Sequence, residues 1–114
     1  MFGRKSSGRQ ARAAHDGEID IADMDFLRDS REVARLWVEN NGPATCLIQP
    51  DILRESEMFG MLMVDTIRHA ARAYAQCHGL SEEEALSRIW QGVDMERANN
   101  TTGLDTVQDY DPPA

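Results

Sequence analysis

The chain has 114 residues, of which 41% are hydrophobic and 28% charged, and its formal net charge is −8. This length fits one small globular domain. The charge is uneven, because residues 1–15 carry Arg4, Lys5, Arg9 and Arg12 without an acid, while acids outnumber bases in the remainder. Phosphate contacts need Lys and Arg, so the acidic remainder argues against nucleic acid as the main partner.

Several sequence features argue against membrane, secreted and metal-binding classes. The longest central apolar run, Met58–Val64, is too short to span a bilayer, and no apolar stretch follows the basic N-terminus as in a secretory signal. Cys46 and Cys77 stand alone in unlike elements, without the spacing of a disulfide framework or a zinc site. We therefore expect a cytoplasmic protein with reduced thiols, no membrane attachment and no cofactor.

Composition divides the chain into three parts. Residues 1–17 have Gly, Ser and Arg without apolar periodicity, so they are predicted to form a disordered basic tail. Residues 99–114, with a Thr-Thr-Gly run and a Pro-Pro ending, are predicted to form a disordered acidic tail. Residues 18–98 are predicted to fold as one small α+β domain.

The start of this domain, residues 18–32, allows more than one structure. Ile19 and Ile21 alternate with acids, as in a short edge strand, whereas Met24–Arg28 fits a single helical turn. The segment could also form an arm that caps the core. The sequence leaves these alternatives open.

The clearest β signal is a hairpin. Val33–Glu39 and Ala44–Gln49 are rich in β-prone residues, and Asn40–Pro43 joins them with an Asn-Gly pair of the kind that hairpin turns favour. Pro43 lacks an N–H, so it should lie in the turn or at the start of the second strand.

The two faces of the first strand differ in character. Ala34, Leu36 and Val38 share one face, which we expect to lie on a long helix. Trp37 then lies on the less protected face, together with Leu47 of the second strand. A Trp in that position must be covered either by the lead-in segment or by a partner.

The long helix is predicted over Ser56–His78. Its apolar stripe contains nine residues that share one broad face: Phe59, Leu62, Met63, Thr66, Ile67, Ala70, Ala73, Tyr74 and Cys77. Met58, Met61 and Val64 lie outside this stripe, so the start of the helix should be covered on a second side. Gly60 inside the pattern indicates either the close approach of another backbone or a helix that has barely begun.

Capping residues delimit two helices. Asp51 and Ser56 are candidate N-caps of the first helix, and Gly79 is expected to end it. Ser81 with Glu84 three residues later forms a capping-box pattern for a second helix. This second helix is expected to run to about Arg97 and to close at Asn99, with apolar positions at Leu86, Ile89, Trp90 and Val93.

Few residues suggest chemistry. Asp65 and His69 stand four residues apart and can meet on one helix face, as in an oriented acid–base pair. The neighbouring Arg68 and Arg72 favour a solvated charge network instead. Cys77 lies on the core stripe, where a cysteine usually acts as a small inert hydrophobe. No catalytic or metal-binding residue is therefore assigned.

Three stretches resemble a known family: RLWVENNG, MFGMLMVDTIRHAARAYAQ and SEEEALSRIWQG. Together they resemble a family of small alphaproteobacterial proteins classed as a domain of unknown function. The resemblance covers roughly residues 24–97. It implies a compact α+β domain, and no catalytic residues come with it.

These observations predict a non-catalytic interaction module that forms a homodimer and has a further, unidentified protein partner. Trp37, Met58 and Met61 are the expected interface residues, because each lies off the faces that one chain can cover. One alternative is that the lead-in segment covers them within one chain. Another is a small enzyme or metal-binding protein that uses Asp65 and His69. A third is a nucleic-acid- or ribosome-associated accessory factor that binds through the basic tail.

The basic tail gives a first testable prediction. We expect no appreciable binding of a labelled RNA or DNA oligonucleotide at physiological salt, with or without residues 1–15, because the acidic remainder opposes it. Fluorescence anisotropy over a salt series measures this directly. Sub-micromolar binding by the intact chain that is lost on truncation would show the expectation to be wrong.

Overall fold

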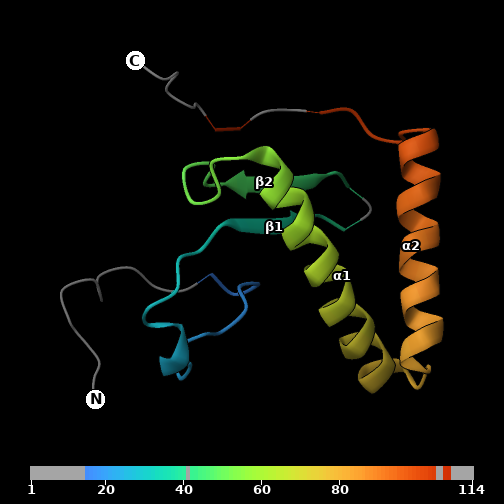
Figure 1. The fold of residues 1–114 in the computed structure, drawn as a ribbon, viewed down its shortest axis with the longest axis horizontal. Coiled ribbons are helices and arrows are strands. Elements are labelled where there is room, and N and C mark those ends of the chain that lie inside the picture. The colour runs from blue at the N-terminus through green and yellow to red at the C-terminus, as the bar shows by residue number, and fades with distance from the viewer. Residues whose placement is uncertain (1–14, 41, 105–106, 109–114) are drawn as a thin grey trace. The chain divides into compact units, whose positions relative to one another are not determined.

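A computed structural model of the chain describes residues 15–40, 42–104 and 107–108 (Figure 1). The predicted basic tail lies almost wholly outside these residues. The chain divides into two compact units, Met1–Arg31 and Glu32–Ala114. The second unit holds an antiparallel hairpin followed by two helices, which confirms the predicted small α+β fold.

The described part of the first unit contains one short helical turn. This turn, η2 (Asp25–Leu27), lies where the sequence allowed a turn near Met24–Arg28. Its backbone N–H groups bond three residues back, as Leu27 N does to Met24 O over 3.0 Å. The described residues around Ile19 and Ile21 form no strand. The helical alternative is therefore correct for this segment.

The hairpin consists of β1 (Ala34–Val38) and β2 (Ala44–Ile48). The strands are antiparallel, with Leu36 opposite Cys46 and Trp37 opposite Thr45. Gly42 N donates to Glu39 O over 3.0 Å, which closes the turn. Pro43 stands directly before β2, as its missing N–H predicted. The hairpin is confirmed, and each strand is shorter than the sequence suggested.

The protected face of β1 is not the one that the sequence analysis chose. Leu36 and Val38 have 62% and 78% of their surface exposed, whereas Trp37 is half-buried. The prediction placed the face of Ala34, Leu36 and Val38 on the long helix and left Trp37 on the less protected face. An indole buries much more apolar area than Ala or Val does, so covering the Trp face protects more surface.

Helix α1 (Ser56–His78) has the predicted bounds. Its N-cap is Glu55, which makes no side-chain capping bond, so both candidate caps, Asp51 and Ser56, were wrong. Ser56 is already the first helical residue, and a cap must precede it. Gly79 ends the helix as predicted, at φ 73°, with its N–H donating to Ala75 O over 3.2 Å.

Helix α2 (Glu82–Ala98) begins after the predicted cap. Ser81 Oγ accepts from Glu84 N over 3.0 Å, which satisfies one free donor of the first turn. Among the described residues the Glu84 carboxylate accepts from Arg88 Nη2 over 2.7 Å rather than from the Ser81 N–H, so the capping box is not completed. Asn99 closes the helix, with its N–H donating to Met95 O over 3.1 Å.

The two helices pack against each other next to the short loop that joins them, and they diverge away from it (Figure 1). Ala71 of α1 and Ala85 of α2 are the only residues of the described part that are fully buried. Arg72 Nε lies 3.3 Å from Glu82 Oε1 and links the same ends of the two helices. The contact therefore depends on small side chains that let the backbones approach.

Two glycines test this account of the helices. A Cβ at Gly92 inside α2 would meet no atom within 4 Å, so Gly92→Ala should raise the free energy of unfolding by up to about 1 kcal/mol. Gly79 has φ +73°, so Gly79→Ala should lower it by about 1 kcal/mol. Urea unfolding at one fixed protein concentration measures both. Equal effects of the same sign would contradict the assignment.

Candidate functional site

Much of the predicted apolar stripe of α1 is exposed in the part of the chain that the structure describes. Its members divide into two groups: Phe59, Leu62, Met63, Ile67 and Ala70 are half-buried, and Thr66, Ala73, Tyr74 and Cys77 are exposed. Ala71, which the stripe did not include, is instead the buried position. Helix α2 thus approaches α1 beside the stripe rather than on it. We call Thr66, Ala73, Tyr74 and Cys77 the open face of α1.

The first turns of α1 expose a second apolar surface. Met58 and Met61 lie one turn apart, and Met61 has 68% of its surface exposed. Val64 is exposed one turn further on. Of the expected interface residues, the structure therefore places Met58 and Met61 at the surface and leaves Trp37 half-buried. Their role in an interface stays a prediction.

Gly60 lies in the same early part of α1 as the exposed methionines. The helix begins at Ser56, so Gly60 lies well inside it, and the alternative of a barely begun helix is wrong. A Cβ at Gly60 would meet no atom within 4 Å. No backbone of the described chain approaches it, so the glycine leaves room on the helix face that it shares with Val64.

A small charged depression contains the candidate acid–base pair. It holds about 160 Å³ and is lined by five residues: Asp65, Arg68, His69, Arg72 and Glu82. Arg72 pairs with Glu82, and Arg68 Nη1 lies 3.9 Å from Asp65 Oδ1. In the part of the chain that the structure describes, Asp65 pairs with Arg68 and forms no hydrogen bond with His69. The depression is thus a set of exposed ion pairs with His69 beside it.

The cysteines do not join this depression. Cys46 and Cys77 are both free and exposed, so the expectation that Cys77 is buried was wrong. The reason is the displaced helix contact, which covers Ala71 and leaves the stripe around Cys77 open. No group of three His, Cys, Asp or Glu side chains in the described part could hold a metal ion.

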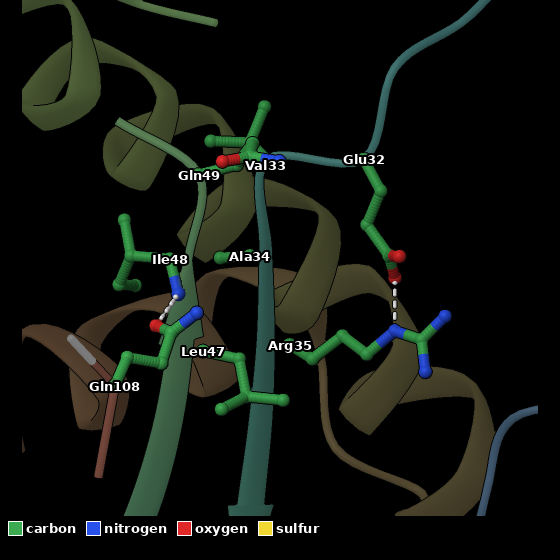
Figure 2. A pocket seen from close by; sticks show the side chains of 8 residues that line it. All are labelled: Glu32, Val33, Ala34, Arg35, Leu47, Ile48, Gln49 and Gln108. Atoms are coloured by element: carbon green, nitrogen blue, oxygen red, sulfur yellow. Dashed lines mark hydrogen bonds and ion pairs between the residues drawn. The ribbon is translucent and has the colours of Figure 1, made fainter. Parts of the chain in front are cut away.

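A second hollow, of about 200 Å³, lies along the hairpin (Figure 2). Its lining includes Gln108, whose Oε1 accepts from Ile48 N over 2.8 Å. Glu32 Oε2 accepts from Arg35 Nε over 2.7 Å at another part of the hollow. Sequence analysis missed Gln108, because a single Gln in a polar, Asp-rich segment carries no periodic or motif signal. The chain end after α2 thus reaches back to the sheet at this residue.

Comparison with known proteins identifies the family. Residues 22–101 match the family described as Domain of unknown function (DUF5076). This match covers well over half of the chain, so the chain belongs to that family. The predicted resemblance to a domain of unknown function is confirmed, whereas its alphaproteobacterial origin stays a prediction.

A solved structure shares the fold. It is named "putative pyruvate dehydrogenase from the photosynthetic bacterium Rhodopseudomonas palustrus CGA009" and is 30% identical in sequence, with a TM-score of 0.62. The likeness covers 86% of this chain and 100% of that one. None of the curated proteins compared with this chain matches it. No helix in the described ranges has the length and apolar character needed to cross a membrane.

The charged depression gives a prediction for His69. His69→Gln should change the free energy of unfolding by less than about 1 kcal/mol, because exposed ion-pair networks contribute little. Ala71→Leu is the control, since overpacking the buried helix contact should cost about 1–3 kcal/mol. Thermal or urea unfolding measures both variants. Stoichiometric Zn²⁺ uptake that His69→Gln abolishes would contradict the view of His69 as part of a surface charge network.

Proposed function

We propose that this protein is a small cytoplasmic interaction module that acts as a homodimer and binds partners rather than catalysing a reaction. One observation carries the proposal. The described residues bury only Ala71 and Ala85 fully, while Met58, Met61 and the open face of α1 remain accessible. Met58 and Met61 lie one turn apart, and neighbouring exposed apolar side chains of this kind support a protein interaction site.

A comparison of burial and association free energies shows that a stable dimer needs more than one contact residue. Burying one large apolar side chain stabilises a fold or complex by about 1.5–3 kcal/mol, so Met61 buried in both copies would contribute about 3–6 kcal/mol. Association costs about 4–15 kcal/mol in lost freedom, and a micromolar Kd needs about 8 kcal/mol of net binding free energy, so Met61 alone is not enough. Met58 and Trp37 are needed as well. A twofold interface uses each of them twice.

The nature of the exposed residues also favours an interface. Met is flexible and adapts its shape to a facing surface, and it is enriched with aromatic residues in interface cores. Tyr74, on the open face, has an apolar ring and a hydroxyl that suits a partly wet rim. A second copy of this chain is therefore the simplest partner for the exposed residues of α1. A further protein partner could bind the surface that the homodimer leaves exposed.

An enzymatic function has less support. The name of the similar solved structure attributes a dehydrogenase to that protein. In the described part of this chain, the charged depression and the hairpin hollow hold about 160 and 200 Å³. Pockets for small molecules usually hold about 300–1,000 Å³. The exposed apolar surface thus supports binding to another protein better than it supports chemistry on a small molecule.

The proposal predicts the mass in solution. At micromolar concentration, light scattering should give a dimer of twice 12.8 kDa. Met61→Glu should raise the dimer Kd at least about 100-fold, which corresponds to about 2.7 kcal/mol, because it places a charge in the apolar contact.

Met95→Glu is the matched control. Met95 on α2 has 67% of its surface exposed, against 68% for Met61, and the substitution is the same. The control should leave the Kd unchanged within about threefold, provided that circular dichroism shows both variants folded. A monomeric unmodified chain at this concentration would refute the dimer. Equal dissociation by both variants would refute the assignment to α1.

A further inference from the structure

The hydrogen-bond register of the hairpin determines which backbone groups face outward. Gln49 N donates to Val33 O over 2.8 Å, so these two residues form a bonded pair just beyond the strands. Bonded and non-bonded pairs alternate along an antiparallel ladder. With the observed register, Arg35–Leu47 and Trp37–Thr45 are bonded pairs. The residues between them direct their N–H and C=O groups away from the partner strand.

The two outer edges of the hairpin differ in what they meet. On the β2 edge, Ile48 N donates to Gln108 Oε1 over 2.8 Å (Figure 2). Pro50 follows that strand at an outward-facing position, and proline is a common means of blocking an edge. The end of the β2 edge near Ile48 is thus protected by a bound side chain and a proline.

No described residue protects the β1 edge in this way. Its outward groups belong to Ala34, Leu36 and Val38, and the described residues show no hydrogen bond to them outside the hairpin. Leu36 and Val38 also carry highly exposed side chains. An accessible edge of this kind is a template for another strand. A lone two-stranded hairpin is, in addition, only marginally stable in water.

We infer that β1 pairs antiparallel with β1 of a second copy, centred on Leu36, so that two hairpins form one four-stranded sheet. This rests on the proposed homodimer and adds a strand pairing to the contact proposed at Met58 and Met61. Leu36 would exchange two hydrogen bonds with Leu36 of the other copy, and Ala34 two with Val38 of the other copy. By symmetry, all three outward residues of each strand gain partners.

Side chains across this junction are complementary. Pairing Leu36 with itself places Arg35 directly opposite Trp37 of the other copy, on the same face of the sheet. A guanidinium beside an indole is a favourable cation–π arrangement. Glu39 of the other copy is then the diagonal neighbour of Arg35, within reach of its long side chain. The repeated Arg35, Trp37 and Glu39 therefore match their own symmetry copies.

Disulfide trapping tests the pairing. In a Cys46→Ser, Cys77→Ser background, Leu36→Cys should form a disulfide-linked dimer on mild oxidation, because the two Cα atoms of such a pair lie about 5.5 Å apart. Ala44→Cys is the control in the same background, since it is exposed on the β2 edge. A non-reducing gel should show twice 12.8 kDa for the first variant and not for the second.

Proline substitution gives a second, independent measurement. Leu36→Pro removes an outward N–H that the hairpin does not use, and Cys46→Pro does the same on the opposite strand. Leu36→Pro should raise the dimer Kd at least tenfold relative to Cys46→Pro. If Leu36→Pro fails to fold, the disulfide result decides.

The outcomes separate this inference from the proposed function. A dimeric Cys46→Ser, Cys77→Ser protein whose Leu36→Cys variant does not cross-link would overturn the strand pairing and leave the homodimer intact. Cross-linking by Ala44→Cys alone would overturn it as well. A monomeric protein would overturn both.

Discussion

The close approach of α1 and α2 at Ala71 and Ala85 decides what the rest of the second unit must bury elsewhere. Two alanines allow the backbones to come together, but an alanine removes little apolar surface from water. The larger side chains of α1 lie to the sides of this contact, and the helices diverge towards the start of α1 (Figure 1). Met58 and Met61 lie in that diverging half. A helix pair joined through small residues thus leaves its larger apolar groups available for another surface.

The helices and the hairpin were predicted well from the sequence, because most of their ends are determined by residues directly beside them. Gly79 ends α1 since its positive φ favours glycine, and Ser81 starts α2 by accepting a backbone N–H. The hairpin followed from two β-prone runs around an Asn-Gly turn. The N-cap of α1 was missed because Glu55 makes no side-chain bond there, so no capping signal existed to find.

Features that depend on contacts between elements could not be predicted in the same way. Periodicity shows that one side of α1 is apolar, but it does not show on which side α2 docks, and the buried Ala71 lay outside the predicted stripe. The protected face of β1 was reversed for a similar reason, since alternation defines two faces without ranking them. Gln108 reaches Ile48 from sixty residues away in the sequence, and no local pattern encodes such a contact. For the candidate site, sequence placed Asp65 and His69 on one helix correctly, but the addition of Glu82 to that charged group required the packing of α2.

Charge and apolar surface share one side of α1, and this arrangement restricts where another molecule can bind. Met58 and Met61 lie in the first turns, while Asp65, Arg68 and Arg72 emerge on the same side one to four turns later. Arg72 is occupied by Glu82, so this side of the later turns is committed to α2 and to solvent. On this side of α1, an apolar partner surface is therefore confined to the start of the helix. The edge of β1 is another place where the described residues of the second unit offer groups to a partner, in this case backbone groups that the hairpin does not use. Apolar contact gives little directional information, whereas backbone pairing fixes a register, so a contact that used both would be stable and also unique in geometry.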